Sequence, residues 1–147
     1  MITSCTLEDV EWLMEDLRNM HTEMSPFGKM ADGKCADLLA DSIKHHCVLK
    51  KVDSGKSMGH MCVRLESHWY TDDLALYEYY IYVKPDYRQT RTAFDLYKTA
   101  KGIAQKNNLP FFYGTFRNNK ADFNRVHKFL QRQGGEQIGS QFFIGAS

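Results

Sequence analysis

Apolar side chains recur at every third or fourth position in the first third of the chain. The first set is Val10, Leu13, Met14, Leu17 and Met20, and the same spacing returns at Cys35, Leu38, Leu39, Ser42 and Ile43. This spacing places each set on one face of an α-helix. Thr6-Leu7-Glu8-Asp9 precedes the first set and reads as a capping box at a helix start. The pattern predicts a short strand over residues 2–5, followed by two helices separated at 25–28.

From residue 47 the alternation of apolar and polar positions changes to a period of two, which is typical of β-strands. Runs at 47–52 and 58–65 flank Asp53-Ser54-Gly55-Lys56, a sequence that favours a hairpin turn. A third run, at 74–83, is rich in aromatic and β-branched residues and suits the interior of a sheet. Pro85 cannot donate to a strand ladder, so we expect this strand to end before it.

The second half of the chain returns to helical spacing. Ala93, Leu96, Tyr97, Ala100, Ile103 and Ala104 share one face of a predicted helix that ends near 107–110. A short strand at 111–116, a helix at 120–133 closed by Gly134 and Gly135, and a last strand at 137–144 complete the prediction. A strand, helix, strand unit over 74–116 requires a right-handed crossover and parallel neighbours. We therefore expect one mixed α/β (α+β) domain over residues 1–147.

Composition and net charge indicate one soluble domain and argue against nucleic acid or a membrane as its partner. The chain has 147 residues, 43% of them apolar and 25% charged, which suits one soluble domain. No apolar run reaches the roughly 18 residues of a membrane span, and the first residues lack the pattern of a signal peptide, so we expect a cytoplasmic protein. The net charge of +1 gives no reason to expect nucleic acid or an anionic membrane as partner. Four cysteines without a CxxC pair are expected to stay reduced.

The stretch 82–93 combines a strand end, a short loop and a helix start. Unpaired amides and the helix dipole make such a start a site for phosphate. Lys84, Arg88 and Arg91 add positive charge there, at a cost of about 0.3–1 kcal/mol for each cation within the first turn. A bound anion would remove that cost. The alternative is that the three side chains simply extend into water, and we favour the bound phosphate.

This stretch resembles a motif of the GNAT family of N-acetyltransferases, V-x-P-x-x-(R/Q)-x-x-G-x-(G/A). Val83, Pro85, Arg88 and Ala93 occupy its positions. The segments 6–10 and 129–135 are also similar to the family, so the resemblance covers nearly the whole chain. His68-Trp69-Tyr70-Thr71-Asp72-Asp73 is similar to the short members encoded by tailed phages. The resemblance implies a mixed, mostly antiparallel sheet with one splayed parallel strand pair, flanked by about four helices.

The resemblance also implies a reaction, the transfer of an acetyl group from acetyl-CoA to an amine of a small molecule or a protein. The main-chain amide of Val83, or of Tyr82, would polarise the thioester carbonyl. Glu78 on the central strand is the candidate base, acting through water, although it is equally well read as a polar partner of neighbouring tyrosines. The residues implied in holding acetyl-CoA are Tyr82, Val83, Arg88, Gln89, Thr90, Arg91, Thr92 and Ala93.

Two positions depart from the family pattern. Arg91 stands where the motif has glycine, so its side chain must point away for a diphosphate to approach the backbone. Leu130 stands where many members have a tyrosine that protonates the CoA thiolate, and His127, Tyr97 or Tyr113 are the nearest substitutes. These departures keep an alternative open, a catalytically degenerate GNAT-fold protein that binds a partner or belongs to a phage virion. A homo-oligomer is a further alternative.

Two other patterns carry less weight. If the hairpin turn is centred between Ser54 and Gly55, Cys47 lies opposite Cys62 and His45 shares their face with His60, a set that could ligate zinc. The neighbours along each strand lie about 7 Å apart, which is wide for one ion, so we expect no metal. The aromatic residues at 111–116 could stack on RNA bases, but no RNP-type motif accompanies them, and we expect them in the core.

Overall fold

The computed structural model describes residues 1–24, 28–114, 120–139 and 144–145, without the side chains of 120–123. Within them, one sheet has the strand order β1-β2-β3-β4-β5. The strands are β1 (Ile2–Ser4), β2 (Val48–Asp53), β3 (Lys56–Ser67), β4 (Leu74–Val83) and β5 (Phe111–Phe112). The helices are α1 (Val10–Met24), α2 (Asp32–Lys44), α3 (Thr92–Lys106) and α4 (Lys120–Arg132). Neighbouring strands are antiparallel except β4 and β5, which are parallel, so the predicted mixed class and its parallel pair are confirmed.

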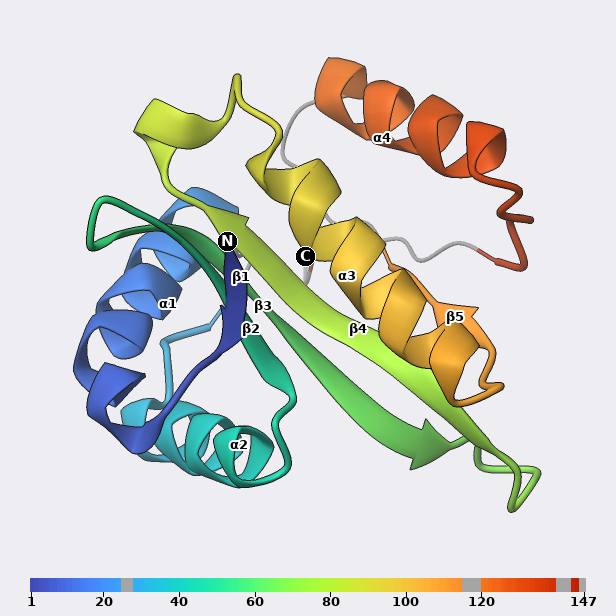
Figure 1. Ribbon diagram of the computed structural model, residues 1–147, viewed down its shortest axis with the longest axis horizontal. Coiled ribbons are helices and arrows are strands. Elements are labelled where there is room, and N and C mark those ends of the chain that lie inside the picture. Colours follow the sequence, from blue (N-terminus) through green and yellow to red (C-terminus); the bar gives the residue numbers. More distant parts are fainter. Residues whose placement is uncertain (25–27, 115–119, 140–143, 146–147) are drawn as a thin grey trace.

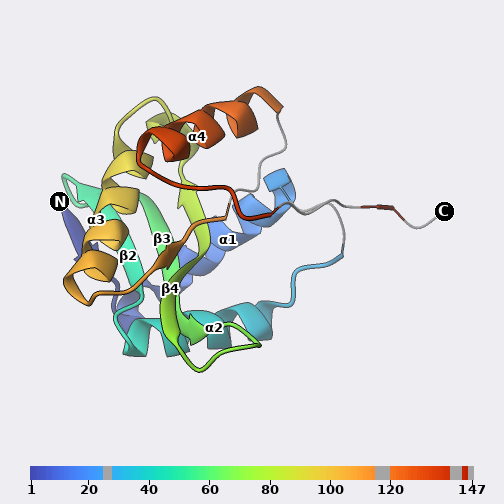
Figure 2. The ribbon, with the colours of Figure 1, turned by 90° about the vertical axis from the view of Figure 1, so that its right-hand side faces the viewer.

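Helices cover both faces of the sheet (Figure 1, Figure 2). α1 and α2 lie on one face and α3 lies on the other, with α4 beside α3. Each face buries its own apolar cluster. The cluster under α1 and α2 includes Leu13, Leu17, Leu39, Ile43 and Val48. The cluster under α3 includes Met61, Leu76, Ile81, Leu96 and Ala100. The apolar stripes expected from helical spacing are therefore the surfaces that cover the sheet.

The predicted capping residues begin the first helical segment. A 3₁₀ turn (Leu7–Asp9) leads directly into α1, and the Asp9 carboxylate accepts a hydrogen bond from the Thr6 amide at 2.8 Å. The same carboxylate accepts from the Trp12 indole at 2.9 Å and from Lys50 of β2 at 2.7 Å. Burial by itself would raise the pKa of Asp9, but these donors outweigh burial and hold the pKa below its ordinary value. Asp9 thus ties the start of α1 to the sheet.

The predicted hairpin is present, but its register differs from the expected one. Ser54 and Gly55 both adopt positive φ at the turn, as a two-residue hairpin loop requires. A bulge between Lys51 and Val52 then shifts the pairing, so that Val48, not Cys47, lies opposite Cys62. One extra residue in β3 displaces every later pair by one position. The predicted Cys47–Cys62 alignment is therefore wrong.

A second bulge lies in β4 and sets the orientation of its last residues. Cys62 pairs with Tyr80 while the next residue, Val63, pairs with Glu78, so Tyr79 is the extra residue. Side chains alternate along a strand, and the extra residue moves the alternation by one. As a result Ile81 and Val83 lie on the α3 face together with Leu76. The end of β4 therefore presents Val83 toward α3 and Tyr82 toward α1.

The C-terminal part differs most from the sequence-based expectation. The strand predicted at 111–116 comprises Phe111–Phe112, while residues 113–114 are not in a strand and 115–116 lie outside the described residues. The helix predicted at 120–133 is confirmed as α4, and Gly134 follows it with φ +84°. Residues 137–139 and 144 of the last predicted strand are not in a strand, and 140–143 lie outside the described residues.

Candidate active site

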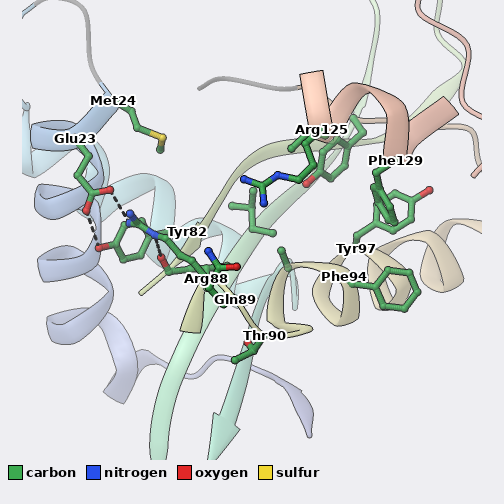
Figure 3. A pocket seen from close by; sticks show the side chains of 15 residues that line it. Glu23, Met24, Tyr82, Arg88, Gln89, Thr90, Phe94, Tyr97, Arg125 and Phe129 are labelled. Carbon is green, nitrogen blue, oxygen red and sulfur yellow. Dashed lines mark hydrogen bonds and ion pairs between the residues drawn. The ribbon is translucent and has the colours of Figure 1, made fainter. Parts of the chain in front are cut away.

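A cavity of about 550 Å³ opens at the end of β4 (Figure 3). The last turn of α1, the loop after β4, the first turns of α3, and α4 surround it. Six of the eight residues implied in holding acetyl-CoA line this cavity, namely Tyr82, Val83, Arg88, Gln89, Thr90 and Ala93. The other two, Arg91 and Thr92, do not line it, because Arg91 points to solvent and Thr92 is fully buried.

The loop between β4 and α3 is a pair of tight turns. A 3₁₀ turn (Pro85–Tyr87) is followed by a second turn that runs into α3. The Arg88 amide donates to the Pro85 carbonyl at 3.3 Å, and the Thr90 amide donates to the Tyr87 carbonyl at 3.1 Å. The Thr90 hydroxyl donates to the Tyr87 carbonyl at 2.6 Å and lies 3.3 Å from the Thr92 amide. The Tyr87 amide donates to the Lys84 carbonyl at 2.9 Å, so four amides between Tyr87 and Thr92 are bonded within this segment.

The three cations expected to gather at this helix start point in different directions. Lys84 follows Val83 with the opposite orientation, so its ammonium lies on the α1 face, 3.8 Å from Asp16. The Arg91 guanidinium lies 4.8 Å from the centre of the Phe94 ring and is 75% exposed. Arg88 alone of the three lines the cavity. A second arginine, Arg125, reaches the cavity from α4 (Figure 3).

Arg88 is held by two oxygen atoms. Its Nε donates to the Val83 carbonyl at 2.9 Å, and its Nη2 donates to Glu23 Oε2 at 2.6 Å. The guanidinium also lies 5.7 Å from the centre of the Tyr82 ring. The Tyr82 hydroxyl lies 3.4 Å from Glu23 Oε1, and burial followed by the Glu23 charge raises the pKa of Tyr82 (Figure 3). These contacts join the end of α1 to the loop after β4.

The backbone amide of Val83 points toward the β5 side of β4. The Lys84 amide donates to the Met58 carbonyl of β3 at 3.0 Å. Successive amides along a strand point to opposite edges, so the Val83 amide points to the other edge. Among the described residues, β5 pairs with β4 at Leu76 and Tyr77. Residues 113–114 are not in a strand, so the two strands part after Tyr77 within the described residues, and the Val83 N–H points past the described end of β5.

A glycine in β3, Gly59, allows the end of β4 and the start of α3 to pack closely against that strand. A Cβ at Gly59 would lie 2.6 Å from the Tyr82 carbonyl oxygen, 3.0 Å from the Val83 Cα and 3.4 Å from a Thr92 methyl. Two of these atoms belong to backbone, which cannot move aside as a flexible side chain would. Gly59 therefore permits β3, the end of β4 and the start of α3 to meet at one point.

Glu78 lies on the same face of β4 as the cavity but is not among the residues that line it. Its Oε2 lies 3.7 Å from the position of a Cβ at Gly114, just after β5. The side chain is half-buried and contacts other groups of the chain. Glu78 thus sits between the two parallel strands, farther along β4 from its end than Val83.

Aromatic side chains from α3, α4 and the end of β5 form one wall of the cavity. Tyr97 is almost buried, and burial raises its pKa. Its ring contacts those of Tyr113 and Phe129 at centroid distances of 5.5 and 5.3 Å. Both tyrosines named above as substitutes for the missing acid therefore line the cavity, whereas His127 does not.

Sequence reasoning missed the parts of the cavity that come from outside the motif. These residues are Glu23, Met24, Arg125, Val126 and Phe129. The spacing of Val126 and Phe129 on the predicted helix indicates that they share a face, so they could have been anticipated as packing residues. No pattern in the sequence marks Glu23, which reaches the site only because α1 ends there.

A second polar group is buried between α1 and the sheet. His60 is fully buried, with Nδ1 3.2 Å from Asp16 Oδ2 and Nε2 3.1 Å from the Tyr80 hydroxyl. Burial lowers the pKa of His60, with Asp16 opposing that effect. Among the described residues, no group of three or more His, Cys, Asp or Glu side chains is placed to hold a metal ion.

Comparisons with known proteins place this architecture among acetyltransferase structures. No protein-family model and no curated protein matches the sequence. An aminoglycoside acetyltransferase from an uncultured soil metagenomic sample matches with TM-score 0.70 and 14% identity, over 100% of this chain and 96% of its own. A ribosomal-protein-alanine N-acetyltransferase from Brucella melitensis biovar Abortus 2308 matches with TM-score 0.70 and 15% identity, over 100% and 99%.

A third solved structure is a predicted acetyltransferase from Clostridium acetobutylicum with acetyl-CoA. It matches with TM-score 0.73 and 7% identity, over 99% of this chain and 95% of its own. Together with the mostly antiparallel sheet and the parallel β4–β5 pair, these likenesses show that the chain has the GNAT fold. Among the described residues, no helix has the length and apolar character needed to cross a membrane.

Proposed function

We propose that the protein is an N-acetyltransferase that transfers the acetyl group of acetyl-CoA to an amine of a small molecule or a protein. The observation that carries this proposal is the cavity at the end of β4, which brings Val83, Arg88, Ala93 and Arg125 together. The shared fold supports it, because one similar structure is described with acetyl-CoA and others as acetyltransferases.

Binding of the diphosphate would use positive charge and the helix start. Arg88 and Arg125 supply the charge from opposite sides of the cavity. Gln89 and Ala93 line the cavity next to the start of α3, where amides lack helical partners, so we assign the phosphate contacts to their amides. The Arg91 side chain lies outside the cavity, which leaves the backbone open to close approach. Thr90 and the buried Thr92 hold the helix start in place through their 2.8 Å hydroxyl contact.

The chemistry would follow from positioning and from one oxyanion donor. The amine nitrogen attacks the thioester carbonyl, a C–N bond forms, and the carbonyl oxygen takes up negative charge. The Val83 N–H faces the space where that oxygen would lie, which favours Val83 over Tyr82 as donor. Collapse of the intermediate breaks the C–S bond and releases the CoA thiolate. Glu78 takes the proton of the amine through water.

The thiolate also needs a proton donor, and we assign this role to Tyr113. It follows β5 and lines the cavity across from the end of β4, where the thioester sulfur would lie. Tyr97 lines the same cavity from α3, but it lies on the helix side, away from the diverging strands. The pair therefore offers a matched comparison of two tyrosines in one site.

Calorimetric titration with acetyl-CoA tests the proposal directly. We expect binding to the unmodified protein, and we expect Arg88→Ala to weaken it by about 1.5 kcal/mol, the lower end of the range for hydrogen bonds to charged groups. The lower end applies because Glu23 competes with a phosphate for the Arg88 guanidinium. Arg18→Ala is the control, since Arg18 lies on the exposed part of α1 and is paired with Asp32.

A non-catalytic protein with the same fold is the second candidate. The four amides bonded within residues 84–92 and the Arg88–Glu23 pair favour it, because these bonds occupy donors that could otherwise reach a diphosphate. Absence of binding at millimolar acetyl-CoA would reject the enzyme and favour a binding protein or a virion component. Binding without any effect of Arg88→Ala would show that the phosphates lie elsewhere.

A further inference from the structure

Glu23 is the single carboxylate among the described residues that line the cavity. It lies in the last turn of α1, and its side chain is 34% exposed. The other charged residues of the described lining are Arg88 and Arg125, both positive. One acidic group therefore contacts one cation, Arg88, and faces a second, Arg125, across a space whose other lining is mostly aromatic and apolar. Figure 3 shows Glu23 on the α1 side of the cavity and Arg125 on the α4 side.

The Glu23 carboxylate is occupied in the structure by Arg88. Arg88 Nη2 lies 2.6 Å from Glu23 Oε2, and the remaining oxygen, Oε1, lies 3.4 Å from the Tyr82 hydroxyl. Arg88 is the same residue that would meet the diphosphate of acetyl-CoA. A guanidinium that turns to a doubly charged diphosphate can no longer give the same donors to a carboxylate.

If the Arg88 side chain moved away from Glu23, the cavity could bind a different cation. Glu23 would then be a partly buried carboxylate without its cation, near the Tyr82 hydroxyl, and the Tyr82 ring would lose the guanidinium that lies over it. An unpaired charge in such a place is unfavourable, and a second cation restores the balance. An ammonium group suits the position, since it can pair with the carboxylate and lie against aromatic rings.

We propose that Glu23 is the residue that binds the ammonium group of the acceptor, and that it becomes available when the diphosphate of acetyl-CoA draws Arg88 away. This inference rests on the proposed function and adds to it the substrate contact and its control. The two ligands then bind with positive coupling. The diphosphate takes Arg88 and leaves Glu23 without a cation, and the ammonium group supplies a new cation to Glu23. Coupling of this kind is reciprocal between the two binding affinities.

The competing interpretation is that the ion pair only ties α1 to the loop after β4. In that case Arg88 keeps Glu23 in the ligand-bound protein, and removal of Glu23 loosens the loop and weakens acetyl-CoA binding. The two interpretations predict opposite signs for the same substitution. This difference in sign makes Glu23→Gln the decisive variant.

The first experiment is a calorimetric titration of the full chain with coenzyme A, which carries the diphosphate but no acetyl group. Glu23→Gln should bind it about two- to fivefold more tightly than the unmodified protein, because Arg88 no longer has an anionic partner to leave. The gain is modest since the two side chains are 34% and 43% exposed. Glu11→Gln, on an exposed position of the same helix, is the control and should change nothing. Equal or weaker binding by Glu23→Gln overturns the inference.

The second experiment uses spermidine as the amine probe, with and without saturating coenzyme A. In the unmodified protein, coenzyme A should raise spermidine affinity about fivefold or more, and Glu23→Gln should abolish this gain. Arg88→Ala should bind spermidine more tightly than the unmodified protein does without coenzyme A, and coenzyme A should add little. Failure of Arg88→Ala to bind spermidine overturns the assignment of Glu23, as does a gain that persists in Glu23→Gln.

The results separate this inference from the proposed function. If coenzyme A binds but spermidine shows no coupling through Glu23, the acetyltransferase proposal stands and the role of Glu23 is rejected. If coenzyme A does not bind to the unmodified protein or to Glu23→Gln, both proposals are rejected. If coenzyme A binds only to Glu23→Gln, the ion pair blocks the anion site in the unmodified chain, the diphosphate does not draw Arg88 away, and both proposals are rejected.

Discussion

The buried side chain of His60 contacts groups from both α1 and β4. Asp16 and Trp12 contact it from α1, and Tyr80 and Tyr82 contact it from β4. Burial is the larger influence and lowers the pKa of His60, while the Asp16 carboxylate acts in the opposite direction. The imidazole is therefore neutral in the folded protein at a pH where the unfolded chain already binds a proton.

This difference predicts a loss of stability in mild acid. The unfolded histidine titrates near its ordinary pKa of about 6.5, so stability is full above that pH and declines as pH falls below it. Urea unfolding at pH 7.5 and 5.5 should show a lower midpoint at 5.5. His60→Gln should show a smaller difference between the two pH values, whereas His21→Gln on α1 should keep the full one. Equal differences in all three proteins would rule out His60 as the cause.

Tyr113 and Tyr97 provide a second test at the scale of single residues. Both carry a hydroxyl at the same cavity, but only Tyr113 follows the strand that diverges from β4. Loss of a general acid costs typically about 100-fold in rate or more. We expect Tyr113→Phe to lower kcat about 100-fold with little change in KM for acetyl-CoA, and Tyr97→Phe to change kcat less than about threefold. Thiol release from CoA measures both, and the reverse order of effects would assign the acid to Tyr97.

At the scale of elements, the close contact of β3, β4 and α3 depends on one position without a side chain. Gly59 faces the backbone of Tyr82 and Val83 and a methyl of Thr92. A side chain at this position would have to displace the backbone of Tyr82 and Val83 or the start of α3. The geometry of the site is therefore built into the packing of the sheet.

Gly59→Ala should disturb both stability and binding. A Cβ only 2.6 Å from a backbone oxygen forces the strands apart, and overpacking of this kind costs about 1–3 kcal/mol. We expect a lower free energy of unfolding together with weaker acetyl-CoA binding. Gly102→Ala is the matched control, since it lies in α3 with nothing within 4 Å of the added Cβ and should stabilise the helix by about 0.5–1 kcal/mol. An unaltered Gly59→Ala protein would show that the strands can separate freely.

At the scale of the whole molecule, the cavity joins parts of the fold that share no core cluster. α1 belongs to the cluster on one face of the sheet and α3 to the cluster on the other. Arg88 and Glu23 connect the two across the end of β4. A ligand at this point contacts elements from both faces and should stabilise the folded chain as a unit.

Acetyl-CoA should therefore raise the thermal stability of the full chain. A ligand at 100 times its Kd adds about 2.7 kcal/mol to the free energy of unfolding. For a chain of this length that increase corresponds to a rise in Tm of about 5–10 °C. Differential scanning calorimetry with acetyl-CoA, and with ATP as a control for nonspecific phosphate binding, measures the rise. An equal rise with ATP would point to a general anion site.

Much of the fold could be predicted because its signals are local. The run of aromatic and β-branched residues at 74–83 predicted the bounds of β4, and Pro85 predicted its end. The spacing of Leu13, Leu17 and Leu39 predicted which helix faces are buried. The motif from Val83 to Ala93 also indicated where the cavity lies, since the residues of one loop stay together in any fold.

The rest depended on contacts between distant segments. No local pattern distinguishes a regular strand from one with an extra residue, such as Met58 in β3 or Tyr79 in β4, and each bulge reverses the faces beyond it. Likewise the sequence shows Lys84, Arg88 and Arg91 as one cluster, whereas the turn after β4 sends them in three directions. The meeting of Glu23 with Arg88 joins residues 65 positions apart.

The amino-acid sequence by itself determined the elements, the faces they bury and the position of the loop after β4, because period, caps and turn residues act over a few neighbouring positions. Only the tertiary structure decided which charges face the cavity and which amide of β4 points away from β3. Those outcomes follow from bulges and from the packing of α1 and α4 around the end of β4, where small changes of register redirect whole side chains.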